Sequence, residues 1–272
     1  MRSIGVGFAV WAAFSIAHAA ENSASGAAQN PMTQQARVGG YLEAAEVPSS
    51  VALVPPPPAP GSGAFARDEE GNRSALALHG SPRWELASQD AVLTFPGITD
   101  TFACALGTSI SDERTPRLMT LLQRTLVDAG RSTSEAKQRY RRARPFMANG
   151  KPICTPQRED VLRADGSYPS GHAAIGYAFG LVLSEIAPEQ AESLIARGRE
   201  FGQSRIVCNV HWPSDVAEGQ LMGAAIVARL HADQEFRVDL EAARAELAAV
   251  RAQRVPPTRD CKLEAQALEP SK

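Results

Sequence analysis

The sequence PSGHAAIGYAFGLVLSEI extends from Pro169 to Ile186 and contains an eleven-residue uncharged run, Ala173–Leu183. A Pro-Ser-Gly turn before such a run is typical of a helix start, because the serine side chain can cap the free amides of the first turn. Large apolar residues then recur at helical spacing, at Ile175, Phe179, Val182, Leu183 and Ile186. We therefore expect a buried helix that begins at Ser170.

Helical patterns continue on both sides of this segment. We expect further helices at about 116–129, 132–144, 188–206, 212–231 and 236–250. Gly130 should end the first, Ser132 and Glu135 should form a capping box for the second, and Pro145 should stop the second near Arg144. No β-strand alternation follows residue 105, and residues 62–105 give no clear assignment. The predicted fold class is all-α, a single globular helical bundle-type domain.

The last of these helices has a narrow apolar stripe with spacing 4-3-4-3, formed by Phe236, Leu240, Ala243, Leu247 and Val250. Such spacing indicates a coiled-coil-like seam, either inside the chain or between two copies. A homodimer is therefore a possible assembly.

The composition argues against a nucleic-acid-binding protein. The 272 residues are 44% hydrophobic, with a formal net charge of −2. A nucleic-acid binder is normally strongly basic, so nucleic acid is not an expected partner.

The N-terminus predicts export. Arg2 precedes an uncharged run, Ile4–Ala17, and an A-x-A site at residues 17–19. This pattern is typical of a secretory signal peptide covering residues 1–20, and the run is too short to span a membrane. We expect a mature protein with no membrane span, located in the periplasm or secreted.

The rest of the chain divides by composition. Residues 21–50 are interpreted as a flexible leader, residues 51–255 as the main domain and residues 256–272 as a C-terminal tail. The proline run in Val54–Gly61 must be extended, either as a spacer or as a strap across the domain. Four cysteines, Cys104, Cys154, Cys208 and Cys261, suggest two disulfides with three possible pairings.

Three clusters contain residue types that carry chemistry. One is the basic segment from Lys137 to Arg144, and another is the turn from Tyr168 to His172. The third is Ser204-Arg205 followed by His211-Trp-Pro-Ser-Asp215. Each alone has an ordinary structural explanation, such as a solvated basic face or a serine cap.

Together the clusters suit one ligand. The side chains of Lys137, Arg144 and Arg205 are fixed cations that match a multiply charged oxyanion. The helix start at Ser170–His172 adds oriented amides, and two histidines add a base or nucleophile and an acid. No carboxylate cluster is present to hold Mg²⁺, so no metal or other cofactor is expected.

These motifs resemble a known signature. Lys137-x6-Arg144-Pro145, Pro169-Ser-Gly-His172 and Ser204-Arg205-x5-His211-x3-Asp215 are similar to the three-part signature of the type 2 phosphatidic acid phosphatase superfamily. The proline run and the segments Asp165–Pro169 and Phe201–Arg205 are similar to its branch of class A bacterial non-specific acid phosphatases.

The resemblance implies a soluble helical fold of the vanadium-haloperoxidase type, with a phosphate pocket between helices. It implies metal-independent, broad-specificity hydrolysis of small-molecule phosphate monoesters through a phosphohistidine. His211 would be the nucleophile, Asp215 would orient it, and His172 would be the general acid and then the base. The oxygens of phosphate would be held by Lys137, Arg144, Ser170, Gly171 and Arg205.

Other functions remain open beside this one. A soluble lipid-phosphate phosphatase, a vanadate-dependent haloperoxidase and a non-catalytic phosphate-binding protein share parts of the same pattern. If the resemblance holds, Cys154 and Cys208 should both lie beside the pocket, because they closely follow Arg144 and closely precede His211. We therefore expect a Cys154–Cys208 disulfide, which leaves Cys104 to pair with Cys261.

Overall fold

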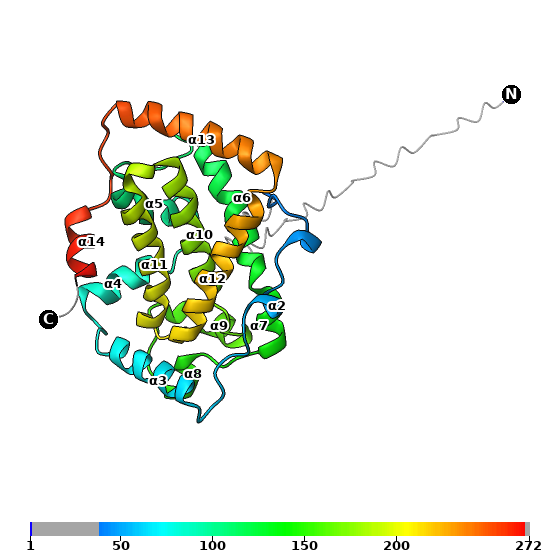
Figure 1. Ribbon diagram of the computed structural model, residues 1–272, viewed down its shortest axis with the longest axis vertical. Coiled ribbons are helices and arrows are strands. Elements are labelled where there is room, and N and C mark those ends of the chain that lie inside the picture. Colours follow the sequence, from blue (N-terminus) through cyan, green and yellow to red (C-terminus); the bar gives the residue numbers. More distant parts are fainter. Residues whose placement is uncertain (2–37, 270–272) are drawn as a thin grey trace.

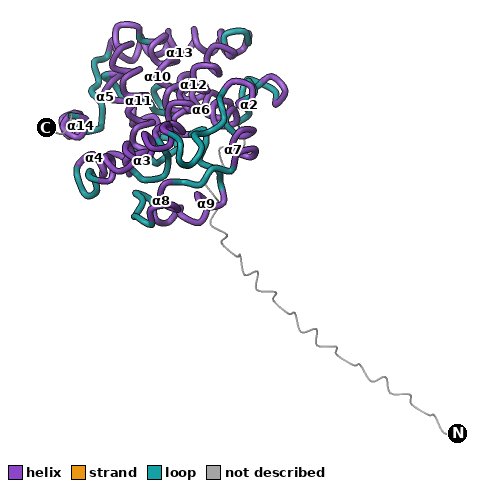
Figure 2. The backbone as a smooth tube through the Cα atoms, turned by 60° about the horizontal axis from the view of Figure 1, so that its bottom comes forward, coloured by secondary structure: helices purple, strands orange, loops and turns teal. Residues whose placement is uncertain are grey.

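The computed structural model describes Met1 and residues 38–269. This part of the chain consists of helices and loops without a strand, as the all-α prediction requires (Figure 2). The elements are η1 (Ala44–Glu46), α2 (Ser50–Leu53), α3 (Gly63–Leu76), α4 (Pro82–Gln89), α5 (Gly97–Leu106), α6 (Pro116–Ser132), α7 (Ser134–Tyr140), α8 (Pro145–Asn149), η2 (Pro156–Arg158), α9 (Glu159–Ala164), α10 (Gly171–Ile186), η3 (Pro188–Gln190), α11 (Ala191–Val207), α12 (Pro213–Leu230), α13 (Gln234–Ala252) and α14 (Cys261–Leu268).

Helix α10 lies at the centre of the bundle and packs against α11, α12 and α6 (Figure 1). Its apolar residues are buried, and Ser170 caps its first turn by accepting a hydrogen bond from the amide of Ala173, as the sequence predicts. Close approach to α11 requires glycine: a Cβ on Gly198 would lie 2.6 Å from the carbonyl oxygen of Gly176. Helices α10 and α11 are thereby packed closely together along their length.

The apolar stripe of α13 is buried within the chain. All five of its residues lie below one tenth exposure, and α13 packs mainly against α6 and secondarily against α10. Glu246 of α13 also accepts hydrogen bonds from the amides of Arg117 and Leu118 at the start of α6. The seam is therefore intramolecular, and the stripe gives no support to a homodimer.

Two helix boundaries differ from the sequence prediction. Helix α6 continues through Gly130 to Ser132, because a glycine inside a helix costs only about 1 kcal/mol and the face that includes Ala129 is buried. Ser132 forms no capping box; its hydroxyl donates to the carbonyl of Ala129. Helix α7 ends at Tyr140 rather than near Arg144, because Arg141 adopts a left-handed conformation with φ of 43°.

The described parts of the predicted leader and tail pack on the rest of the chain. The predicted signal peptide and residues up to 37 lie outside the described residues, apart from Met1. From residue 38 the segment packs on the domain: Tyr41 is buried, and its amide donates to Asp128 at 2.7 Å. The tail forms α14, which a Cys104–Cys261 disulfide fastens to α5. Long-range side-chain contacts, rather than local periodicity, order these two segments.

The proline run is a strap. Val54 is buried against Tyr168, and the carbonyl of Pro55 accepts a 2.7 Å hydrogen bond from the Tyr168 hydroxyl. The unassigned segment that follows forms α3, α4 and α5. Helix α3 lacked an apolar pattern because two of its three buried residues are polar, Asp68 and Asn72.

Candidate active site

His211 and Asp215 lie at the junction of α11 and α12. Pro213 opens α12, so Asp215 is in its first turn and its carboxylate turns back to the entering chain. One oxygen, Oδ2, accepts from the Trp212 amide at 2.8 Å and lies 3.3 Å from Nδ1 of His211. Both side chains are almost fully buried. The carboxylate therefore fixes the imidazole ring in one orientation.

Arg144 contacts the other side of the same ring. Its Nη1 lies 3.0 Å from Nε2 of His211 and also donates to the carbonyl of Val210 at 2.9 Å. Its Nε donates to the carbonyls of Leu162 and Asp165. The guanidinium is 1% exposed, so backbone carbonyls hold it rigidly beside the histidine.

Lys137, from α7, and Arg144 share the Asp165 carboxylate as a partner. Its ammonium group donates to the Asp165 carboxylate at 2.9 Å and to the carbonyl of Gly166. Burial lowers the pKa of Lys137, and the neighbouring charge of Arg144 lowers it further, whereas Asp165 opposes both effects. The positive charges of Lys137 and Arg144 therefore lie close together, on either side of the Asp165 carboxylate.

Arg205 has no ion-pair partner in the part of the chain that the structure describes. It is 2% exposed, and within the described part of the chain its Nε and Nη1 atoms have no hydrogen-bond acceptor. Burial, reinforced by the charge of Arg144, lowers its pKa to about 9. Leaving buried donors unsatisfied is costly, so this guanidinium favours an incoming anion.

The turn before α10 completes the set of donors. The Ser170 side chain is buried, and its hydroxyl accepts only the Ala173 amide among described residues. The amides of Gly171 and His172 precede the first intrahelical bonds and have no acceptor in this part of the structure. Free amides at a helix start attract anions.

His172 lies in the first turn of α10. Its Nε2 is 3.2 Å from the carbonyl of Ala91, and its ring stacks on Phe201. Burial lowers the pKa of His172 well below its ordinary value, assisted by the charge of Arg205. Burial also lowers the pKa of His211, here assisted by Arg144, Lys137 and then Arg205. Arg144 contacts His211, and the Ser170 amide donates to the Asp215 carbonyl at 2.8 Å, so all three sequence clusters meet at one site.

The chain is similar to known proteins over most of its length. The profile of the PAP2 superfamily matches residues 118–239. An acid phosphatase of Zymomonas mobilis is 41% identical over 210 residues, 77% of this chain and 80% of that protein. Non-specific acid phosphatases of Providencia stuartii and Salmonella typhi are 41% and 40% identical, over 76% and 79% of this chain and 84% and 86% of theirs.

The chain belongs to the bacterial non-specific acid phosphatases of the PAP2 superfamily. The resemblance that the motifs indicated is therefore correct, as is the all-α fold. In the described residues, no helix is long and apolar enough to cross a membrane, and no three acidic, His or Cys side chains gather as metal ligands would.

Sequence reasoning missed the carboxylates that hold the cations of this phosphatase. Arg142 is 8% exposed and donates to Asp68 and Asp215, each at 2.6 Å, so it links α3 to the carboxylate that orients His211. Asp165 bridges Lys137 and Arg144. Arg142 and Asp165 both lie in segments that contain the motifs. Nothing in the local sequence distinguishes Arg142 from the surface arginines beside it.

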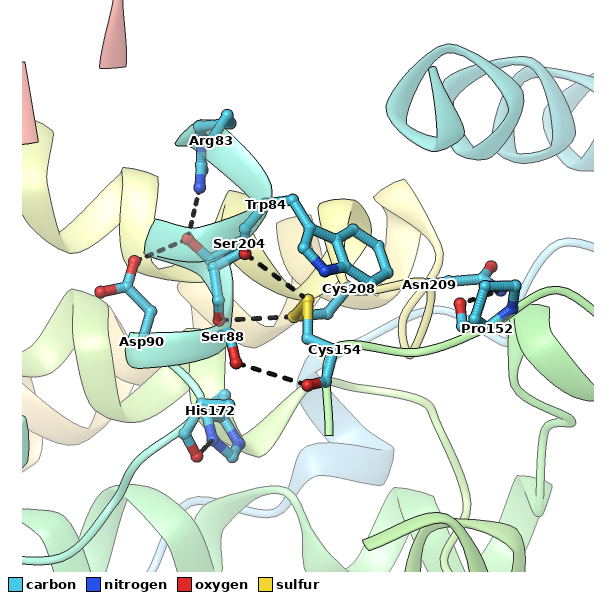
Figure 3. The surroundings of a disulfide bond; sticks show 12 residues. Arg83, Trp84, Ser88, Asp90, Pro152, Cys154, His172, Ser204, Cys208 and Asn209 are labelled. Atoms are coloured by element: carbon cyan, nitrogen blue, oxygen red, sulfur yellow. Dashed lines mark hydrogen bonds between the residues drawn. A yellow bond between two sulfur atoms is a disulfide. The ribbon is translucent and has the colours of Figure 1, made fainter. Parts of the chain in front are cut away.

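Helix α4 was not recognised from sequence and supports the site from one side. The Cys154–Cys208 disulfide, which pairs as predicted, lies against it: the Ser88 hydroxyl donates to the carbonyl of Cys154 (Figure 3). Asp90, at the end of α4, is fully buried and accepts from the Ser204 hydroxyl at 2.6 Å. The neighbouring Ala91 supplies the carbonyl for His172, so the α4 terminus contacts two sides of the site.

A cavity of about 530 Å³ borders Lys137, whereas Arg144 and Arg205 do not line it. Neither histidine lines it; the lining includes Lys137, Gln138, Arg141, Arg142, Arg163 and Asp165. Asp165 therefore faces the cavity while its carboxylate contacts Arg144, the partner of His211.

Proposed function

We propose that this chain hydrolyses phosphate monoesters through a phosphohistidine on His211, without a metal ion. The activity follows from its family, whose relatives are named acid phosphatases or non-specific acid phosphatases. One observation carries the mechanistic part: His211 lies between Asp215 and Arg144, with Nδ1 toward the carboxylate and Nε2 toward the guanidinium. This arrangement suits a neutral ring whose Nε2 lone pair attacks phosphorus.

In the first step, Nε2 of His211 forms a bond to phosphorus as the bond to the ester oxygen breaks. The departing alkoxide takes a proton from His172, and the charge that develops on His211 is stabilised by Asp215. In the second step, His172 removes a proton from water, which attacks phosphorus and breaks the N–P bond. Inorganic phosphate leaves, and both histidines return to their starting states.

The cations and amides hold the three nonreacting oxygens. Arg205 brings two unsatisfied buried donors, and Lys137 and Arg144 bring two further positive charges. Ser170 and the Gly171 amide add hydrogen bonds at the helix start. Phosphoryl transfer depends mostly on positioning and charge stabilisation, and loss of one such donor typically reduces the rate about 10²–10³-fold.

The N-terminal signal pattern supports export to the periplasm, and two disulfides are compatible with an oxidising compartment. Fractionation of cells that express the full chain tests this proposal. Recovery of the activity in the cytoplasmic fraction with residues 1–20 still attached contradicts it.

The decisive experiment is a substrate panel with the protein lacking residues 1–20, measured with and without EDTA. We expect release of phosphate from aryl and alkyl monoesters at equal rates in both conditions. Activity lost in EDTA and restored by Mg²⁺ or Zn²⁺ contradicts the metal-independent mechanism. Halide oxidation with added vanadate, in the absence of ester hydrolysis, points instead to a haloperoxidase.

A further inference from the structure

Asp165 holds two of the proposed phosphate-binding cations at once. Its Oδ2 atom lies 2.9 Å from Nζ of Lys137 and 3.0 Å from Nη2 of Arg144. A single anionic oxygen between an ammonium and a guanidinium is the arrangement that a phosphate oxygen would adopt there. The free protein therefore already has an anion at part of its own ligand site.

The exposure of Asp165 distinguishes it from the structural carboxylates nearby. The side chains of Asp215 and Asp68 are 0% and 3% exposed, and each is held by Arg142. The side chain of Asp165 is 49% exposed and faces the 530 Å³ cavity. A half-exposed carboxylate can exchange its protein partners for water at little cost, which a buried one cannot.

The cations do not depend on the Asp165 carboxylate for their positions. Arg144 is held through Nε and Nη1 by the backbone carbonyls of Leu162, Asp165 and Val210, and its Nη2 contacts the carboxylate and, at 3.5 Å, the carbonyl of Gly166. Lys137 keeps the carbonyl of Gly166 as a second acceptor. If the Asp165 side chain turned toward the cavity, both cations would remain in place with free donors.

We infer that the Asp165 carboxylate is a built-in competitor of phosphate, which occupies Lys137 and Arg144 in the free enzyme and is displaced when substrate binds. The inference rests on the proposed function of the site. It makes Asp165 a residue that tunes affinity: displacement weakens the binding of substrate and product alike, and the returning carboxylate assists the release of inorganic phosphate.

Isothermal titration of inorganic phosphate into the Asp165→Asn and Asp165→Ala variants tests this inference. We expect binding about fivefold tighter than in the wild type, because one or two partly exposed ion pairs no longer compete. The inhibition constant for phosphate and the KM for p-nitrophenyl phosphate should fall by similar factors. Glu159→Gln is the matched control, since it removes one negative charge from the nearby α9 but contacts Arg163 only.

The outcomes separate the two proposals. Phosphate binding that is unchanged or weaker in both folded variants, while the wild type hydrolyses esters, overturns the competitor role alone. Equal tightening in Glu159→Gln also overturns it, because the effect is then general electrostatics. A wild type that neither binds phosphate nor hydrolyses esters overturns the proposed function and the inference with it.

Discussion

Arg144 and His211 are joined by a 3.0 Å contact between Nη1 and Nε2. A guanidinium can only donate, so Nε2 must carry a lone pair and the ring proton must lie on Nδ1, toward Asp215. Both neighbours of the ring thus select the same neutral tautomer. A phosphate that binds Arg144 would take over the Nη1 hydrogen bond and so free Nε2 of His211. Phosphorus would then lie next to Nε2.

The first prediction concerns the covalent intermediate. In rapid-quench experiments with radiolabelled substrate, label should appear on His211, because only its Nε2 is held unprotonated by an obligate donor. The variant His211→Ala should form no phosphoenzyme and should lose turnover. Label on His172 or Ser170 reverses the assignment. Retained binding of inorganic phosphate in His211→Ala serves as the control for an intact site.

The role of His172 predicts a dependence on the leaving group. His172→Ala should slow the phosphorylation step most for alkyl phosphates, whose alkoxides need a proton to depart, and least for p-nitrophenyl phosphate. Removal of the general acid typically costs about 10²–10⁴-fold in rate. The measurement is the phosphorylation rate across a series of esters with different leaving-group pKa. A uniform loss across the series contradicts the assignment.

The variant Asp215→Asn separates the orientation of His211 from the binding of phosphate. We expect a loss in kcat of about 10²–10⁴-fold, because an amide cannot stabilise the developing charge on His211 and can favour the wrong tautomer. The fold should persist, since Arg142 keeps Asp68 as its buried partner. Affinity for inorganic phosphate should change little, because Lys137, Arg144 and Arg205 remain. A collapse of phosphate affinity in a folded variant argues against this division of roles.

The pH dependence follows from the two histidines. Burial and neighbouring cations put the pKa of His211 and of His172 well below 6.5. His211 must be neutral to attack and His172 protonated to donate, so the kcat/KM profile should be a bell on the acid side of neutrality. A bound phosphate dianion raises the pKa of His172, so the alkaline limb of kcat should lie at higher pH than that of kcat/KM. A kcat/KM still rising at about pH 9, far above the ordinary histidine pKa, refutes this prediction.

The same lowered pKa values predict a loss of stability in acid. The unfolded chain binds protons at His172 and His211 near pH 6.5, whereas the folded chain resists them until lower pH. Conformational stability should therefore fall as pH drops below 6.5 toward the pKa values of the folded state. Thermal denaturation across this range measures the effect. Added phosphate should reduce it, because the anion compensates the new positive charge.

The two disulfides should have different consequences when removed. The pair Cys104→Ser and Cys261→Ser should lower the free energy of unfolding by about 2–4 kcal/mol with little change in kcat, because this bridge joins α14 to α5, and neither helix contains a proposed site residue. The pair Cys154→Ser and Cys208→Ser should also reduce activity, since Cys208 leads directly to His211 and packs on α4. Chemical denaturation and steady-state kinetics on both pairs provide the comparison.

Much of the fold could be predicted because it is encoded locally. The central helix, its serine cap and the apolar faces of α6, α11, α12 and α13 follow from periodicity and turn chemistry. Helix α3 escaped prediction because it buries Asp68 and Asn72 rather than a regular apolar face. Helix α4 escaped prediction because its eight residues are too few to show a repeating apolar stripe. Their positions depend on partners that are distant in sequence, such as Asn209 for Asn72.

The sequence by itself determined the chemistry available to this protein: the motif cations and histidines, the Ser170 helix start and the family to which they point. Only the tertiary structure decided how those groups are partnered. Arg142 and Arg144 are both arginines of one basic segment, yet one is bound to buried Asp68 and Asp215 and the other faces His211. Such pairing depends on packing across long sequence separations, where each charge has many equally plausible partners and burial selects among them.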